Sequence, residues 1–189
     1  MHCLPHLSHD FFQRARSIEA LISDVDGVLT DGKIIYSDDR MIKQFSALDG
    51  AGIKLAQAAG LTTGLISAGK SSAVRQRAAI LNIPHLYLGR WDKEAALEEL
   101  LEVLKLPATA ICYIGDDLPD IPVLKRVGLP VAVANAMPAV KEAAGLQTTR
   151  QGGDGALREV VEFVLYAQGR LTAALQEFEL RNSGEQPQN

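Results

Sequence analysis

The chain has 189 residues, 47% of them hydrophobic, and a formal net charge of −4. These values predict a single globular domain over residues 1–189 and argue against a disordered chain. No long basic run is present, so we expect neither nucleic acid nor an anionic membrane as a partner. The apolar runs are too short to span a bilayer, and residues 1–16 lack the apolar core of a signal peptide.

The two cysteines, Cys3 and Cys112, do not form the framework of a disulfide-rich protein. Cys112 lies within an apolar run, where a buried free thiol is expected, and this usage suits a reducing, cytoplasmic environment. A terminal metal site built from His2, Cys3, His6 and His9 is disfavoured, because a short terminal segment lacks the ordered surroundings that metal ligands need.

In chain order, strand-like apolar runs alternate with segments of helical periodicity. The predicted helices run over Phe11–Ile18, from Asp49 as a cap to Ala59, from Ser71 as a cap to Asn82, and over Lys93–Leu104, Ile121–Val127, Pro138–Ala144, Gly155–Tyr166 and Leu171–Leu180. The predicted strands are the run that begins at Ala20, Leu61–Ile66, His85–Leu88, Ala110–Ile114, Leu129–Val133 and Gln147–Thr149, with a hairpin over Gly32–Tyr36 and Met41–Phe45. Arg181–Asn189 is predicted to be a disordered polar tail. This alternation predicts an α/β fold, a Rossmann-like three-layer sandwich with a mostly parallel central sheet.

The first predicted strand, Ala20–Ser23, ends in two carboxylates that are two residues apart. Asp24 and Asp26 are followed by Gly27, which frees the backbone to turn, and by Thr30. Two acids this close repel each other unless a cation or a shared proton lies between them. The simpler interpretation is a strand that ends in a side-chain-capped turn, and the stretch alone does not exclude it.

Three later residues bear on that choice. Ser67 and Asp116 each follow an apolar strand, and Lys93 opens a helix. Taken singly, Ser67 is typical of a loop, Lys93 of a solvated helix surface and Asp116 of a helix cap. The carboxyl ends of strands in an open parallel sheet meet at the edge where ligands bind. Asp24, Ser67 and Asp116 are therefore expected to converge.

An acid pair, a hydroxyl, a lysine and a second acid pair, in this order, resemble the four motifs of the haloacid dehalogenase superfamily. Within it, DVDGVLTDG (24–32), DGAGI (49–53), GDDLPD (115–120) and GGDGALRE (152–159) resemble the 3-deoxy-D-manno-octulosonate 8-phosphate phosphatases. The resemblance covers about 18–171 and leaves the C-terminal tail, 172–189, outside it. It implies that the hairpin replaces a cap domain and serves as a subunit interface, so we expect a homo-oligomer, specifically a tetramer.

The resemblance also implies a magnesium-dependent phosphomonoesterase that acts on a phosphorylated keto-deoxy sugar acid through an aspartyl phosphate. Asp24 is the expected nucleophile, because a carboxylate needs no activating base, and Asp26 is the expected general acid and base. Ser67 would donate a hydrogen bond to a phosphoryl oxygen, and Lys93 would neutralise charge. Mg²⁺ is expected on the carboxylates of Asp24 and Asp116 and the backbone carbonyl of Asp26.

Two departures from the family pattern affect the expected substrate pocket. Leu48 stands where the family usually has a polar or basic residue, and Gly69 stands where it often has an arginine. The substrate contacts expected from the resemblance are Asp26, Asp49, Gly50, Lys54, Lys70, Arg77 and Lys93, with Asp117 and Asp120 in supporting positions. Lys70 follows the arginine position and is a candidate to replace its charge.

Other functions fit parts of the pattern. A phosphatase of the same mechanism would serve a nine-carbon sugar acid phosphate equally well. A non-catalytic oligomerisation module would keep the fold, but it would not need Asp24, Asp26, Ser67, Lys93 and Asp116 together. A response-regulator receiver also has acids, a hydroxyl and a lysine, but the D-x-D-G-x-x-T form of the first motif argues against it.

Overall fold

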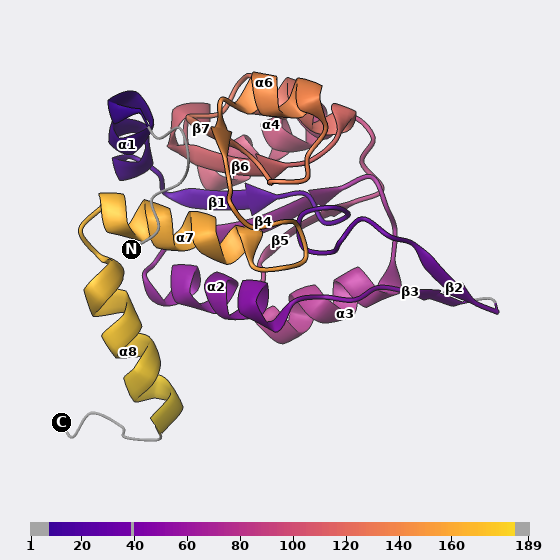
Figure 1. Cartoon of the computed structure of the whole chain (residues 1–189), viewed down its shortest axis with the longest axis horizontal. Coiled ribbons are helices and arrows are strands. Elements are labelled where there is room, and N and C mark those ends of the chain that lie inside the picture. Colours follow the sequence, from indigo (N-terminus) through magenta and orange to yellow (C-terminus); the bar gives the residue numbers. More distant parts are fainter. Residues whose placement is uncertain (1–7, 39, 184–189) are drawn as a thin grey trace.

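A six-stranded sheet lies at the centre of the computed structural model, which describes residues 8–38 and 40–183 (Figure 1). The strand order is β5-β4-β1-β6-β7-β8, and every pairing in this sheet is parallel. The strands are β1 Ala20–Ser23, β4 Thr62–Ser67, β5 His85–Leu88, β6 Ile111–Gly115, β7 Leu129–Ala132 and β8 Leu146–Gln147. Strand β1 is fully buried between β4 and β6, so its carboxyl end opens at the middle of the sheet.

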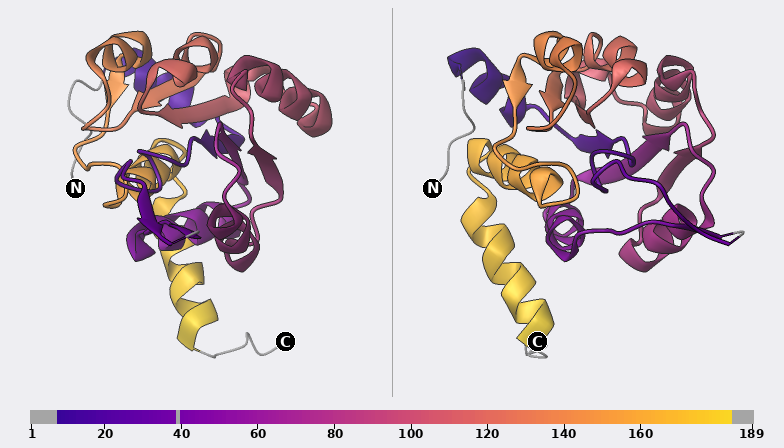
Figure 2. Two further views of the ribbon diagram at one scale, coloured as in Figure 1. Left: turned by 90° about the vertical axis from the view of Figure 1, so that its right-hand side faces the viewer. Right: turned by 45° about the vertical axis from the view of Figure 1, so that its right-hand side comes forward.

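Helices cover both faces of the sheet, as the two turned views show most clearly (Figure 2). The helices are α1 His9–Arg16, α2 Ala47–Ala58, α3 Ser72–Leu81, α4 Lys93–Leu104, α5 Ile121–Leu124, α6 Pro138–Ala144, α7 Ala156–Ala167 and α8 Leu171–Ser183, with short 3-10 helices over Ala108–Ala110 and Leu118–Asp120. Helices α2, α3 and α7 lie on one face, and α4, α5 and α6 lie on the other (Figure 1). The predicted three-layer α/β sandwich with a parallel sheet is confirmed.

The predicted hairpin is a separate antiparallel pair, β2 Ile35–Ser37 and β3 Arg40–Ile42, which projects away from the layers (Figure 1). Its apolar side chains are exposed: Ile34 is 57% exposed, Tyr36 69% and Met41 39%. An isolated two-stranded ribbon is marginally stable in water, so we expect another surface to cover these apolar side chains.

Most element boundaries agree with the sequence to within two or three residues, and β5, α4 and α6 match the prediction residue for residue. Two expectations were wrong. Ser46, not Asp49, is the N-cap of α2, because its hydroxyl accepts the Leu48 N–H at 3.2 Å. The polar tail was expected to begin at Arg181, but α8 continues to Ser183. The terminal residues His2, Cys3 and His6 lie outside the described residues.

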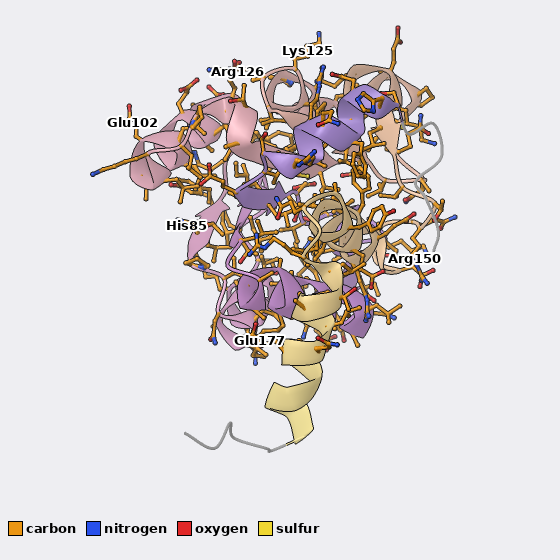
Figure 3. The ribbon with its side chains drawn as sticks, turned by 90° about the vertical axis from the view of Figure 1, so that its left-hand side faces the viewer. His85, Glu102, Lys125, Arg126, Arg150 and Glu177 are labelled. Carbon is orange, nitrogen blue, oxygen red and sulfur yellow. The ribbon has the colours of Figure 1, made fainter. Side chains whose placement is uncertain are left out.

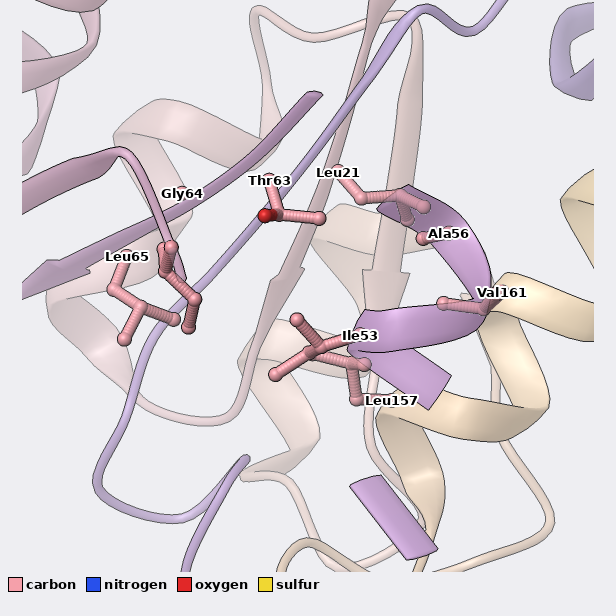
Figure 4. Close-up of a pocket in the computed structure, with 9 residues that line it drawn as sticks. Leu21, Ile53, Ala56, Thr63, Gly64, Leu65, Leu157 and Val161 are labelled. Carbon is pink, nitrogen blue, oxygen red and sulfur yellow. The ribbon is translucent and has the colours of Figure 1, made fainter. Parts of the chain in front are cut away.

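The core contains one small gap between the sheet and the helix pair α2 and α7 (Figure 4). Its volume is about 10 Å³, and apolar side chains such as Leu21, Ile53 and Val161 line it. A space of this size holds at most about one water molecule. It is therefore a packing imperfection rather than a ligand site.

The outer surface of the helical layers carries charged side chains, among them Arg126 and Glu102 (Figure 3). Arg126 binds Glu94 at 3.1 Å and also contacts Glu98, which ties the end of α5 to α4. Exposed pairs of this kind contribute about 0–1 kcal/mol each. Within residues 8–38 and 40–183, no helix combines the length and apolarity needed to cross a bilayer.

Candidate active site

The carboxyl end of β1 positions Asp24 at the centre of the site. Its backbone N–H donates to the carbonyl of Ile114 at 2.9 Å, which continues the β1–β6 pairing one residue past the strand. Residue Asp24 is only 6% exposed. A carboxylate held this way has little freedom of movement, and burial of a charge without a partner would be unfavourable.

Lys93, the first residue of α4, supplies that partner. Its Nζ lies 2.9 Å from Asp24 Oδ1 and 2.6 Å from Asp120 Oδ1, and the side chain is 3% exposed. Asp92 caps α4 by accepting the Ala95 N–H at 3.0 Å, so the helix start is fixed by its own sequence. The ammonium is thus held between two carboxylates and aimed at the end of β1.

Asp120 acts as the hub of the surrounding network. Its Oδ1 accepts the Tyr113 hydroxyl at 2.7 Å, and its Oδ2 accepts the N–H groups of Asp116 at 2.9 Å and Asp117 at 3.2 Å. Asp117 in turn accepts the Leu118 N–H at 2.8 Å and caps the short helix Leu118–Asp120. Both residues therefore shape the loop after β6, and Asp120, which is 0% exposed, has no oxygen without a partner.

Asp116 is different, because its Oδ1 is buried without a hydrogen-bond partner. One oxygen atom from each of Asp24, Asp116 and Asp120 lies within 4.8 Å of the others. A buried, unpartnered carboxylate oxygen beside another carboxylate is the arrangement that a hard cation with oxygen ligands would stabilise. Because the oxygens of Asp120 are already bonded, Asp24 and Asp116 are the two carboxylates suited to hold it.

The pKa values follow from this crowding. Burial raises the pKa of Asp24 to about 6, although Lys93 opposes the rise. Burial, followed by the charge on Asp24, raises the pKa of Asp116 to about 8. Burial lowers the pKa of Lys93, but the charges of Asp24 and Asp120 outweigh it, so that pKa lies above its ordinary value. The cluster therefore holds more negative charge than one lysine balances.

On the side of β4, Asp26 and Ser67 meet at Gly69. A Cβ placed on Gly69 would lie 3.4 Å from Asp26 Oδ2 and 3.5 Å from Ser67 Oγ, and Ser67 Oγ accepts the Gly69 N–H at 3.1 Å. An open cavity of about 660 Å³ begins here. Its lining includes apolar side chains of the hairpin region and two lysines: Asp26, Ile34, Met41, Lys43, Gly69, Lys70, Ser71, Ser72, Ala73 and Gln76.

With this geometry established, comparison with known proteins identifies the family. Residues 70–160 match the model of the haloacid dehalogenase-like hydrolases. The chain is 42% identical over 173 residues to the 3-deoxy-D-manno-octulosonate 8-phosphate phosphatase KdsC of Escherichia coli, covering 91% of this chain and 92% of that protein. The chain belongs to the 3-deoxy-D-manno-octulosonate 8-phosphate phosphatase family.

Solved structures of relatives agree with this assignment. The 3-deoxy-D-manno-octulosonate 8-phosphate phosphatase of Yersinia pestis superposes with a TM-score of 0.86 at 41% identity, covering 88% of this chain and 90% of that one. The enzyme of Moraxella catarrhalis, solved with magnesium, phosphate and KDO, gives a TM-score of 0.88 at 35% identity, covering 91% and 99% of the two chains.

The glycine-rich segment after β8 braces the first acidic loop of this haloacid dehalogenase-like hydrolase. A Cβ on Gly152 would lie 1.6 Å from the Gly27 carbonyl oxygen, and the Gly153 N–H donates to the Val28 carbonyl at 2.8 Å. Gly27 itself has φ +102°, and a Cβ on it would lie 2.0 Å from Asp116 Oδ2. The glycine-rich segment therefore packs against the backbone of the first acidic loop, and that loop packs against the Asp116 carboxylate; only glycine permits these approaches.

Four residues expected to contact the substrate do not line the cavity beside Asp26, and their contacts with substrate stay predictions. Asp49 is 1% exposed and accepts the N–H groups of Gly155 at 3.1 Å and Arg158 at 3.2 Å, so its carboxylate holds the start of α7. Arg77 donates to the Ser46 carbonyl at 3.1 Å and packs over the Phe45 ring.

The other two of these four residues, Gly50 and Lys54, lie on α2. Gly50 is buried against Arg77, since a Cβ on Gly50 would lie 2.4 Å from Arg77 Nη2. Lys54 is half-buried on α2. Neither residue lines the cavity beside Asp26. Their substrate contacts stay predictions, and Lys70 is the expected substrate contact that does line the cavity alongside Asp26.

Sequence reasoning missed two residues of the site. Tyr113 is 0% exposed and bonds Asp120, and a tyrosine within a fully apolar strand was a signal, because a buried hydroxyl requires a partner. Lys43 follows β3, and its ammonium contacts Asp26 Oδ1. No local signal identified Lys43, because one lysine in an exposed hairpin is ordinarily solvated.

Proposed function

We propose that this protein is a magnesium-dependent phosphomonoesterase that hydrolyses 3-deoxy-D-manno-octulosonate 8-phosphate through an aspartyl-phosphate intermediate. The observation that carries the proposal is the buried cluster of Asp24, Lys93 and Asp116 at the carboxyl end of the central strand. Two relatives, at 42% and 35% identity, are named as phosphatases of this substrate, and the second was solved in complex with magnesium, phosphate and KDO.

Magnesium fits the residues present, because Asp116 Oδ1 is buried without a partner beside the Asp24 carboxylate. We propose that Asp24 and Asp116 hold the ion with their carboxylates and Asp26 with its backbone carbonyl. When bound, the cation would neutralise negative charge on the phosphoryl oxygens and on the two carboxylates.

The chain's own groups account for the two chemical steps. A carboxylate oxygen of Asp24 attacks phosphorus, and the bond from phosphorus to the sugar oxygen breaks while Asp26 gives that oxygen its proton. Asp26 then takes a proton from water, whose oxygen attacks phosphorus and releases inorganic phosphate, which restores Asp24. Lys93 and the Ser67 hydroxyl stabilise charge on the phosphoryl oxygens in both steps.

The cavity beside Asp26 is proposed to hold the sugar. Its volume of about 660 Å³ suits a small ligand, and Lys43 and Lys70 give its lining two cations. A nine-carbon sugar acid phosphate is the second candidate, because the same mechanism would hydrolyse it. Gly69 and Leu48 stand at positions where the octulosonate family usually has polar or basic groups, so we expect a weaker hold on the sugar carboxylate and lower discrimination against other phosphorylated sugars.

We further propose a cytoplasmic homotetramer assembled through the region Lys33–Phe45. The support is the exposed apolar surface of Ile34, Ile35, Tyr36, Met41 and Ile42, whose exposed fractions lie between 39% and 69%. Closed symmetric assembly would bury this surface. Light scattering at micromolar concentration is expected to give four times the chain mass, and a monomer would contradict the proposal.

The decisive experiment measures released phosphate over a panel of phosphorylated sugars and sugar acids, in magnesium and in excess chelator. We expect the highest kcat/KM for the octulosonate phosphate and loss of turnover in chelator. An aryl phosphate belongs in the panel, because a non-catalytic assembly module would release no phosphate from any ester. Preference for the nine-carbon acid would select the second candidate.

A further inference from the structure

Lys43, a basic residue of the hairpin region, contacts a carboxylate of the candidate active site. It follows β3, and its side chain is 3% exposed although the neighbouring strand residues are exposed. Its ammonium contacts Oδ1 of Asp26, whose own side chain is 32% exposed. A lysine is rarely buried without a charged partner, so this ion pair accounts for the inward course of the side chain.

The contact leaves the second carboxylate oxygen of Asp26 on the side of Gly69. A Cβ placed on Gly69 would lie 3.4 Å from Asp26 Oδ2 and 3.5 Å from Ser67 Oγ, so both oxygens border Gly69. A partly exposed carboxylate has several rotamers, and one charged hydrogen bond to Oδ1 selects among them. Lys43 therefore determines the direction in which Asp26 presents Oδ2.

We propose that Lys43 is a positioning residue for Asp26, which aligns its carboxyl group for proton transfer to the departing sugar oxygen. This inference rests on the proposed function, in which Asp26 is the general acid. It also links catalysis to the hairpin, because Lys43 directly follows the last residue of β3. The hairpin of β2 and β3 is then needed for catalysis as well as for the proposed assembly.

Lys70 provides the contrast within the same cavity. Its side chain lies across Gly89, since a Cβ on Gly89 would be 2.2 Å from Lys70 Cε. Lys70 also lines the cavity, but the carboxylate contact to Asp26 comes from Lys43. Removal of the positive charge is thus expected to impair catalysis in different ways at Lys43 and at Lys70.

The test compares Lys43→Met with the wild type on three phosphate esters in saturating magnesium. The octulosonate phosphate has a poor leaving group and a carboxylate, a neutral hexose phosphate has a poor leaving group alone, and p-nitrophenyl phosphate has a good leaving group. The value of kcat/KM covers the steps up to departure of the alcohol. Methionine keeps the length of the side chain, and Lys125→Met, at an exposed lysine that follows α5 outside the hairpin region, is the matched control.

For Lys43→Met we expect kcat/KM to fall about 10- to 100-fold on both alkyl esters and less than about threefold on the aryl ester, because a good leaving group needs little protonation. Lys43→Arg should recover most of the loss. An equal fall on all three esters with a lowered melting temperature would overturn the proposal in favour of a purely structural pair. A fall confined to the sugar acid would overturn it in favour of a contact to the substrate carboxylate. Wild-type protein inactive on every ester would instead refute the proposed function.

Discussion

The two sides of the site differ in how deeply their side chains are buried and how firmly they are held. Around Asp24, Lys93 and Asp120 the side chains are at most 8% exposed, and they are held by the end of β1, the start of α4 and the short helix after β6. Around Gly69 and Lys70 the wall is open, exposed and made of loop and hairpin residues. The difference indicates that the groups for phosphoryl transfer are preorganised within one chain. Binding of the sugar depends on a few side chains of the open wall and on the surface proposed to cover the hairpin.

The strongest test of the ordered side is Asp24→Asn. We expect turnover to fall by about 10⁴-fold or more, because an amide is no nucleophile and is a weaker ligand for magnesium. The fold should survive, since asparagine keeps the shape of the residue. Phosphate release and the melting temperature are measured together, with Asp10→Asn on the exposed face of α1 as the control. Turnover within a few-fold of wild type would refute the mechanism.

The hub of the network comes next in expected effect. Asp120→Ala removes one of the two carboxylates that contact Lys93. It also removes the acceptor for the Tyr113 hydroxyl and for two backbone N–H groups. We expect the free energy of unfolding to fall by about 3–5 kcal/mol and turnover to fall about 100-fold. Tyr113→Phe, which removes one hydrogen bond, should cost about 1 kcal/mol. Urea denaturation checks both, and equal losses for the two variants would show that Asp120 is not the hub.

The placement of this ordered side could be predicted from the sequence because it depends on local patterns. Apolar runs that end in Asp24, Ser67 and Asp116 specify a parallel sheet, and a parallel sheet brings its carboxyl ends together. The helical periodicity of Lys93–Leu104 predicted that Lys93 opens a helix, and the structure shows that Asp92 caps that helix.

What could not be predicted depends on contacts between distant segments. Asp49 is of a residue type that often caps helices, but it accepts hydrogen bonds from Gly155 and Arg158, which lie over a hundred residues away in the sequence. The N-cap of α2 is Ser46. The burial of Lys43 depends on where the hairpin lies relative to Asp26. Gly152 and Gly153 brace the first acidic loop through contacts with the backbone of Gly27 and Val28, which the local sequence around the two glycines does not indicate.

That brace gives a prediction about the boundary between the two sides. In Gly152→Ala the new Cβ would lie 1.6 Å from the Gly27 carbonyl oxygen, so backbone must move. We expect a loss of about 2–3 kcal/mol in the free energy of unfolding, together with reduced turnover because the loop that carries Asp26 is displaced. Gly169→Ala is the control, since nothing lies within 4 Å of its Cβ and only its φ of +70° resists the change. Comparable losses in both variants would mean that the brace is unimportant.

The open side should respond to a gain of charge. Gly69 has room for a side chain, because its Cβ would make ordinary contacts of 3.4 and 3.5 Å with Asp26 and Ser67. The family resemblance places an arginine there, and one charge-assisted hydrogen bond is worth about 1.5–3 kcal/mol, or roughly one to two decades in kcat/KM. We therefore expect Gly69→Arg to raise the preference for the octulosonate phosphate over a neutral hexose phosphate by about tenfold.

The matched variant Gly69→Gln separates charge from bulk. Glutamine adds a long polar side chain at the same backbone position without a positive charge, so it should leave the preference near the wild-type ratio. If Gly69→Arg and Gly69→Gln lower kcat/KM equally on both esters, the added side chain merely obstructs the cavity beside Asp26. If the wild type already rejects the hexose phosphate, the charge for the sugar acid comes from elsewhere in the wall, and Lys70, whose stem rests on Gly89, is then the residue to replace.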